Sequence, residues 1–175
     1  GEKIGIVSAL AMDTPETAAP GDKVIFMDDM ESLKADVQEL TDAGVTKILA
    51  LTHEGYKRDQ EIAAEVAGVD AVVGGHSHTL LGDMEDAEGP YPTMVKAADG
   101  TEVPVVTARA YGKYLGHLTL TWDDSGKLIK AEGQPILLDA SVKPDEKIAA
   151  RVKEMAAPIA ELKQRRVADI SAPID

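Results

Sequence analysis

The sequence predicts an α/β domain, and three patterns support that class. Apolar strand-like runs alternate with helix-like stripes between residues 4 and 73, as in a βαβ unit. Alternating segments separated by turns containing Asp and Gly follow between residues 93 and 138, as in antiparallel hairpins. A long amphipathic helix is predicted from Pro144. At 175 residues with 44% hydrophobic content, the chain can form one domain with a substantial core.

The first part of the predicted βαβ unit has local signals for each element. A strand is expected over Ile4–Leu10, then a loop through Pro20 and a short strand over Val24–Met27. Asp28 with Glu31 three residues later resembles a capping box, so a helix begins there. Its apolar stripe comprises Met30, Leu33, Val37 and Leu40, and Gly44 follows its C-cap.

The unit continues with another strand, a helix and a further strand. Lys47–Thr52 is the expected strand, a short helix spans residues near Asp59–Ala67 and ends at Gly68, and Ala71–Val73 is the next strand. Because one helix lies between two strands of this kind, the segment has the order of a βαβ unit.

Two hairpins are expected next. Ala98-Asp99-Gly100 separates Thr93–Ala97 from Val103–Ala108, and Asp123-Asp124-Ser125-Gly126 turns Leu115–Trp122 back into Lys127–Leu138. His117 falls within an alternating run and is interpreted as a sheet residue.

The helix from Pro144 carries apolar residues at helical spacing: Ile148, Val152, Met155, Ile159 and Leu162. Pro158 should remove one hydrogen bond and bend its axis. Ala168–Asp175 is expected to be a tail or linker.

The charge and composition argue against binding to nucleic acids and membranes and limit the ligands that a metal ion could have. The net charge of −13 opposes binding to nucleic acid polymers and to anionic membrane surfaces, and a small phosphate ester would need bound cations or backbone groups to attract it. Cysteine is absent, so a metal ion would need nitrogen and oxygen ligands. No apolar run approaches the length that crosses a bilayer.

Three of the four histidines follow predicted strands, which favours a metal site. His53 ends the apolar run that contains the predicted strand Lys47–Thr52, and Gly74-Gly75-His76-Ser77-His78 follows the predicted strand Ala71–Val73. In an extended segment residues two apart point to the same side, so His76 and His78 are expected to face one cleft with His53. Asp59, Asp70 and Asp83 are expected to be solvated, and no metal role is assigned to them.

These segments resemble the 5'-nucleotidase group of calcineurin-like metallophosphoesterases, specifically the C-terminal part of the catalytic domain. The resemblance rests on Leu51-Thr52-His53-Glu54-Gly55-Tyr56 with the following Asp59, on Val69 to Thr79 including the two glycines and two histidines, and on Ala110-Tyr111-Gly112-Lys113-Tyr114-Leu115-Gly116. It implies part of a four-layer α/β/β/α sandwich over residues 1–140 and a connector helix with a tail over residues 141–175.

The resemblance implies a site with two divalent metal ions, Mn, Zn or similar. His53 and His76 would bind one ion and His78 the other, and no catalytic residue is assigned. The family's D-x-H motif, bridging aspartate and G-N-H-[ED] motif do not occur in this sequence, and Asp13 is not followed by x-His. The remaining ligands would therefore come from the rest of the catalytic domain.

The expected activity of the intact protein is hydrolysis of 5'-nucleotides or related small phosphate esters by an activated water. Its partners would be that ester, the rest of the catalytic domain and a C-terminal substrate-binding domain. The alternative is that the 175 residues alone are a non-catalytic fragment or metal-binding module. The resemblance favours a periplasmic or extracellular location.

Overall fold

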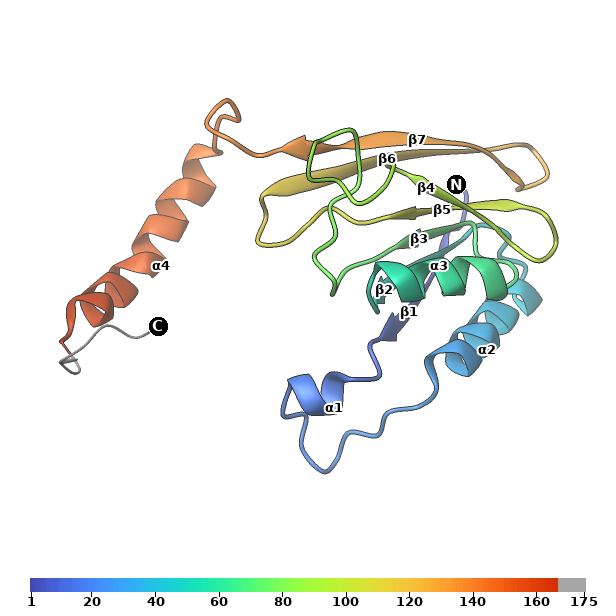
Figure 1. The fold of residues 1–175 in the computed structure, drawn as a ribbon, viewed down its shortest axis with the longest axis horizontal. Helices are drawn as coiled ribbons and strands as arrows, with labels where there is room; N and C mark the ends of the chain where they lie inside the picture. The colour runs from blue at the N-terminus through green and yellow to red at the C-terminus, as the bar shows by residue number, and fades with distance from the viewer. Residues whose placement is uncertain (167–175) are drawn as a thin grey trace. The chain divides into compact units, whose positions relative to one another are not determined.

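The computed structural model describes residues 1–166 and confirms the α/β class (Figure 1). It divides into two compact units, of which the first ends at Leu138 and the second starts at Asp139. The first unit contains a five-stranded sheet in the order β1-β2-β3-β5-β4 and a separate two-stranded sheet, β6-β7. The strands of the larger sheet are β1 (Gly5–Leu10), β2 (Ile48–His53), β3 (Ala71–Val73), β4 (Thr93–Lys96) and β5 (Glu102–Val106).

Two consecutive crossovers join the first three parallel strands of this sheet. The helix α2 (Asp29–Asp42) joins β1 to β2, and α3 (Tyr56–Glu65) joins β2 to β3. Both crossovers advance in the same direction across the sheet, so the right-handed rule places both helices on one face. Their apolar residues, including Leu33 and Ile62, lie in one buried cluster with strand residues such as Ala50. This packing holds the carboxyl ends of β2 and β3 side by side.

The ends of α2 match the sequence prediction. The Asp28 carboxylate accepts a hydrogen bond from the backbone N–H of Glu31 at 2.9 Å. Ala43 is the C-cap, and Gly44 follows it at φ +78°, a conformation that glycine adopts without steric cost. Both signals are local, which is why the sequence reveals them.

Both predicted hairpins are present. β4 and β5 pair antiparallel around a turn with Gly100 at φ +88°. The strands β6 (Tyr114–Trp122) and β7 (Leu128–Leu137) form a longer hairpin, with a register shift between Thr121 and Trp122. The observed ends differ from the predicted ones by a few residues.

The second unit contains α4 (Glu146–Gln164), with Pro158 inside it. Pro144 precedes the N-cap, Asp145, whose carboxylate accepts from the N–H groups of Lys147 and Ile148. The prediction that Pro144 lies in the first helical turn was therefore wrong. The tail expected at Ala168–Asp175 lies outside the described residues.

Three other local predictions were wrong. Val24–Met27 is irregular rather than a strand, and Ile25 is 86% exposed, because no neighbouring strand pairs with the segment. A four-residue helix, α1 (Thr14–Thr17), interrupts the loop where none was predicted. The helix α3 begins at Tyr56 rather than near Asp59, with Gly55 as its N-cap.

The second face of the sheet is exposed at β1 and β2. Ile6, Leu10 and Leu51 lie on this face and are 64%, 48% and 53% exposed. On the opposite face Val7, Ile48 and Ala50 are buried against the helices. The first unit thus has one covered and one uncovered apolar surface. No helix within residues 1–166 has the length and apolarity to cross a membrane.

Candidate functional site

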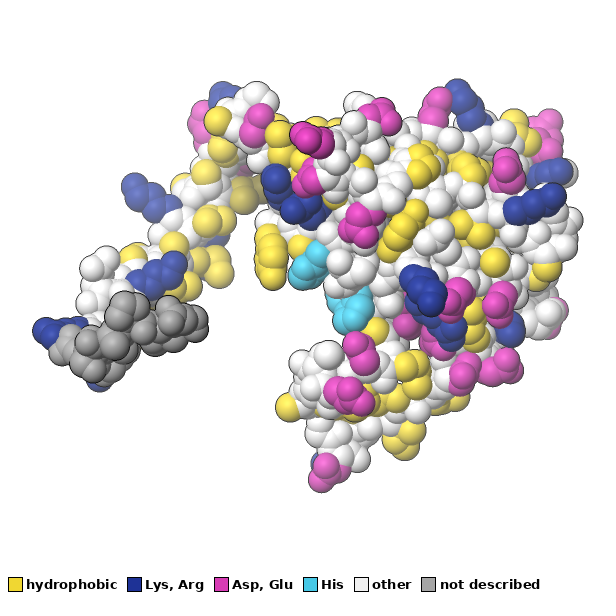
Figure 2. All heavy atoms as spheres, viewed as in Figure 1, with side chains coloured by type: hydrophobic (Ala, Val, Ile, Leu, Met, Phe, Trp, Pro, Cys, Tyr) yellow, Lys and Arg dark blue, Asp and Glu magenta, His cyan; other side chains and the backbone are white. Residues whose placement is uncertain are grey.

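The candidate site lies where β2 and β3 end. His53 is the last residue of β2, and His76 and His78 lie in the loop after β3. Because the two strands are parallel neighbours, their carboxyl ends meet at one edge of the sheet. Figure 2 shows histidine side chains on one face of the molecule with acidic side chains nearby.

His53 and His76 form the central contact of the site. Their ring centroids are 5.2 Å apart, with the rings in an edge arrangement. The His76 side chain is 32% exposed, and its Nε2 lies 3.5 Å from Oδ2 of Asp13, in the loop after β1. Three consecutive strands of the sheet therefore each lead into this region. The sequence predicted the two histidines but assigned no role to Asp13.

His78 makes a different ring contact. Its ring packs at 5.3 Å from the ring of Tyr111, which is 96% exposed. His76 and His78 have φ values of +70° and +56°, so the loop is not extended. The expectation that the two side chains face the same side assumed an extended segment, and that assumption was wrong.

Glycines allow the histidine loops to approach each other. A Cβ at position 75 would lie 3.0 Å from Nδ1 of His53. Gly55, at φ +96°, lies beside the His76 loop, where Oγ of Ser77 accepts a hydrogen bond from the N–H of Tyr56 at 3.0 Å. This bond links the start of α3 to the loop after β3.

A hollow of about 270 Å³ adjoins His76 and is lined by Ala11, Met12, Asp13, Asp29, Glu54, Arg58 and His76. Glu54 Oε1 is buried and has no hydrogen-bond partner among residues 1–166. Burial and then the nearby Asp29 charge raise the pKa of Glu54 to about 7. Sequence reasoning missed Glu54, whose only signal was its position beside His53.

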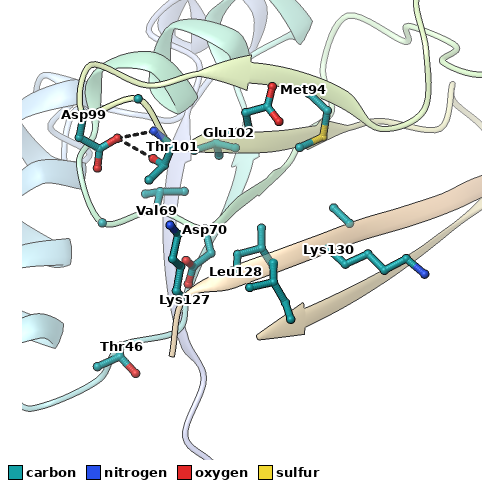
Figure 3. Close-up of a pocket in the computed structure, with 15 residues that line it drawn as sticks. Thr46, Val69, Asp70, Met94, Asp99, Thr101, Glu102, Lys127, Leu128 and Lys130 are labelled. Atoms are coloured by element: carbon teal, nitrogen blue, oxygen red, sulfur yellow. Dashed lines mark hydrogen bonds between the residues drawn. The ribbon is translucent and has the colours of Figure 1, made fainter. Parts of the chain in front are cut away.

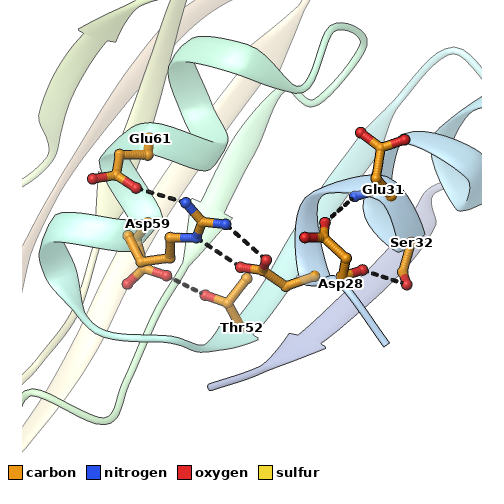
Figure 4. A network of polar contacts seen from close by, with 8 residues as sticks. Asp28, Glu31, Ser32, Thr52, Asp59 and Glu61 are labelled. Carbon is orange, nitrogen blue, oxygen red and sulfur yellow. Dashed lines mark hydrogen bonds and ion pairs between the residues drawn. The ribbon is translucent and has the colours of Figure 1, made fainter. Parts of the chain in front are cut away.

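Arg58 carries the positive charge of this hollow. Its Nε and Nη2 donate to the two Asp29 oxygens, each at 2.7 Å, and its Nη1 donates to Glu61 at 2.7 Å (Figure 4). The Arg58 guanidinium holds the pKa of Asp29 below its usual range. The network joins the first turn of α2 to α3.

Asp59 lies in the core beneath the site and is completely buried. The Thr52 hydroxyl donates to its Oδ1 at 2.6 Å (Figure 4), whereas Oδ2 has no hydrogen-bond partner in the described part of the chain. Burial raises the pKa of Asp59 to about 6 against the lowering effect of the Thr52 hydrogen bond. The expectation that Asp59 is solvated was wrong, because α3 begins a turn earlier than predicted and places it against the sheet.

Asp70 was also expected to be solvated, and it too is largely enclosed. Its Oδ2 accepts from the N–H of Ile48 at 2.9 Å, and burial raises its pKa. Asp70 precedes β3 and therefore lies at the edge of the sheet opposite the histidines. Asp83 is exposed, as expected.

Another hollow, of about 630 Å³, is at that opposite edge (Figure 3). Its lining includes Asp70 and Glu102, at the starts of β3 and β5, and Lys127 beside β7. None of the histidines lines it. Of the three candidate histidines, His76 alone lines the smaller hollow.

The donors at the histidine edge fit part of a metal site. Imidazole nitrogens and carboxylate oxygens suit Zn²⁺ or Mn²⁺, and His53 and His76 lie close enough to contribute to one ion. Within residues 1–166, no three histidine or acidic side chains are grouped so that they could hold an ion by themselves. The chemistry and spacing of His53 and His76 therefore fit two ligands of one ion.

Comparison with known proteins identifies close relatives of the sequence. No protein-family model matches it. The chain is 46% identical over 159 residues to the snake venom 5'-nucleotidase of Gloydius brevicauda, an alignment that covers 88% of this chain and 27% of that protein. It is 42% identical over 158 residues to the 5'-nucleotidase of Homo sapiens, covering 87% of this chain and 28% of the human protein.

The fold has matching solved structures. The 5'-nucleotidase precursor from Thermus thermophilus matches with a TM-score of 0.89 and 39% identity over 96% of this chain and 34% of that one. The NAD nucleotidase of Haemophilus influenzae shares the fold, with a TM-score of 0.71 at 22% identity over 90% of this chain and 31% of that one. The chain thus spans about a third or less of these relatives.

Proposed function

Because the chain belongs to the 5'-nucleotidase group of metallophosphoesterases, we propose that it is a segment of an enzyme that hydrolyses 5'-nucleotides or related small phosphate esters. The observation that carries this proposal is the contact between His53 and His76 at the ends of neighbouring parallel strands. The sequence identity to 5'-nucleotidases supports the nucleotide as the substrate class.

We propose His53, His76 and His78 as metal ligands, the first two for one ion and His78 for a second. The contact between the rings of His53 and His76 supports the assignment of these two to one ion. Two divalent ions, Mn²⁺, Zn²⁺ or similar, would activate a water and stabilise the charge that develops on the phosphoryl group. The ligands that complete both sites would come from the rest of the catalytic domain.

The residues of this chain would bind and orient rather than transfer protons. The glycine at position 75 lets the imidazole of His53 lie against the loop that carries His76. The net charge of −13 repels an anionic phosphate ester, so its binding would depend on the cations that the histidines hold.

Within the intact protein, we propose that residues 1–140 are the C-terminal half of the metallophosphoesterase domain. Residues 141–175 would be the connector toward a C-terminal substrate-binding domain. The long helix of the second unit supports a connector. A periplasmic or extracellular location is supported by the names of two relatives, a venom protein and a precursor.

The test is replacement of each histidine by alanine in the intact protein. His53→Ala, His76→Ala and His78→Ala should each lower Mn²⁺-dependent hydrolysis of a nucleoside 5'-monophosphate by roughly 100-fold or more, because a lost ligand weakens metal binding and transition-state stabilisation. His117→Ala is the control, since His117 is exposed on β6. Unchanged activity in any of the three variants would refute the ligand assignment of that histidine.

For the 175 residues alone, a non-catalytic metal-binding module is the second candidate. It is favoured because the described residues contain no complete group of ligands. The isolated chain should bind Mn²⁺ weakly and hydrolyse no nucleotide. Two ions retained per isolated chain after exhaustive dialysis would contradict this candidate.

A further inference from the structure

Asp59 lies beneath the point where both histidine segments leave the sheet. Its Oδ1 accepts a hydrogen bond from the Thr52 hydroxyl at 2.6 Å, and Thr52 directly precedes His53. On its other side, Oδ2 lies against Gly74, two residues before His76. A Cβ at position 74 would collide with the carboxylate. One side chain of α3 therefore contacts the ends of both β2 and β3.

Packing alone does not explain an aspartate here. The side chain is completely buried, and Oδ2 has no hydrogen-bond partner within residues 1–166. An unsatisfied buried polar atom costs about 1–3 kcal/mol, so an apolar side chain of similar size would suit the core better. The position of the carboxylate between the two loops gives another reason for an aspartate at position 59.

We infer that Asp59 is a positioning residue that sets the spacing of His53 and His76, an inference that rests on their proposed role as ligands. The Thr52 hydroxyl also lies 3.4 Å from the Val73 carbonyl oxygen, so Thr52 joins the same junction. Without the carboxylate, the ends of β2 and β3 lose their common contact. The two imidazoles then sample other separations, which weakens metal binding.

The first experiment compares variants of Asp59 in the intact protein by calorimetric titration with Mn²⁺. Asp59→Ala should lower the affinity roughly 10- to 100-fold, the range typical of residues that orient ligands. Asp59→Asn keeps an oxygen acceptor for Thr52 and should retain most of the affinity. If Asn loses as much as Ala, the charge rather than the hydrogen bond matters, and the positioning role is overturned.

Asp70→Ala is the matched control. Asp70 is also an enclosed carboxylate of the same sheet, but it accepts from Ile48 at the edge opposite the histidines. Its loss should lower the melting temperature without changing the Mn²⁺ affinity. An equal loss of affinity in the Asp70 and Asp59 variants would show that destabilisation alone explains the effect, which overturns the inference.

Thr52 provides a second pair of variants in case Asp59→Ala does not fold. Thr52→Val removes the hydroxyl at nearly constant shape and should lower the Mn²⁺ affinity in the same direction, whereas Thr52→Ser keeps the donor and should preserve it. Val and Ser variants with equal affinity would contradict the inference.

A metal-free measurement separates this inference from the proposed function. In histidine Cε1–H NMR spectra without metal, Asp59→Ala should shift the resonances of His53 and His76 but not that of His117. If His53→Ala and His76→Ala leave Mn²⁺ affinity unchanged, the proposed function fails and this inference falls with it. A different outcome refutes only the positioning role. In it, His53→Ala and His76→Ala lose Mn²⁺ affinity, whereas Asp59→Ala and Thr52→Val keep the affinity and the NMR spectra of wild type.

Discussion

Glu54 combines a buried, unpaired oxygen with a pKa raised to about 7, mainly by burial and then by the Asp29 charge. In the unfolded chain its pKa returns to 4.5. Between these values the folded state holds the proton that the unfolded chain releases. The free energy of unfolding therefore falls as pH rises from about 4.5 to 7.

Glu54→Gln should remove this part of the pH dependence. In the metal-free protein, the free energy of unfolding of the variant minus that of wild type should be about 1 to 2 kcal/mol larger at pH 7.5 than at pH 4. This is less than the full pKa shift implies, because Glu54 is partly exposed. Urea unfolding with a chelator across this pH range measures the effect. Glu39→Gln, an exposed residue of α2, is the control, and parallel pH profiles for Glu54→Gln and wild type would refute the prediction.

At the residue scale, the sequence revealed the ligand candidates better than their surroundings. His53 and the His76 loop follow apolar strands, and that pattern is visible in the sequence. The burial of Asp59 was not predictable from composition, since it depends on how α3 packs against the sheet. The side on which His78 lies depends on positive φ values that no local pattern indicated.

Among the elements, α2 and α3 are joined by the ion pair between Asp29 and Arg58, with two 2.7 Å hydrogen bonds. The Asp29 side chain is 3% exposed and that of Arg58 is 34% exposed. Removing Arg58 leaves a buried carboxylate without its main partner, which is more costly than losing a surface pair.

A double-mutant cycle with Asp29→Asn and Arg58→Met should therefore give a coupling energy of roughly 1–3 kcal/mol in urea unfolding. The exposed pair of Glu31 and Lys34, 3.5 Å apart on α2, is the comparison and should couple by less than about 0.5 kcal/mol. Equal coupling energies for the two pairs would show that the buried pair does not stabilise the contact between the helices.

The helix α4 contains Pro158, which lacks an N–H group to donate within the helix. Pro158→Ala restores that donor and adds the residue with the highest helix propensity. Backbone amides of residues 150–162 should exchange roughly 10-fold or more slowly in the variant, as hydrogen exchange by NMR can measure. Ala156→Gly, in the same helix, should accelerate exchange. Amide exchange that is no slower in Pro158→Ala than in wild type would contradict the prediction that Pro158 destabilises the helix.

The accuracy of the element predictions depended on how local their signals are. The cap at Asp28, the turn at Gly100 and the end of α2 at Gly44 depend on neighbouring residues, and all three were predicted. The strand expected at Val24–Met27 needed a partner strand that its sequence could not reveal. Strand order likewise depends on contacts between distant segments, such as β3 with β5.

For the whole molecule, the uncovered face of β1 and β2 and the net charge of −13 have opposite effects on association. Burying one large aliphatic side chain contributes about 1.5–3 kcal/mol, so Ile6, Leu10 and Leu51 together favour contact with another copy or with a covering sheet. Repulsion between copies opposes this at low ionic strength, because the Debye length is then long.

The 175-residue chain should therefore self-associate more strongly as salt increases. Sedimentation velocity at roughly 50 mM and roughly 500 mM NaCl should show larger species at the higher concentration. Replacing Ile6 and Leu51 by Thr places a β-branched residue at both strand positions while removing apolar area, and should reduce association at both concentrations. Val142→Thr, outside the sheet, is the control. A monomer at both salt concentrations would mean that the exposed face is too small or too interrupted by polar groups, such as Ser8, to overcome the charge.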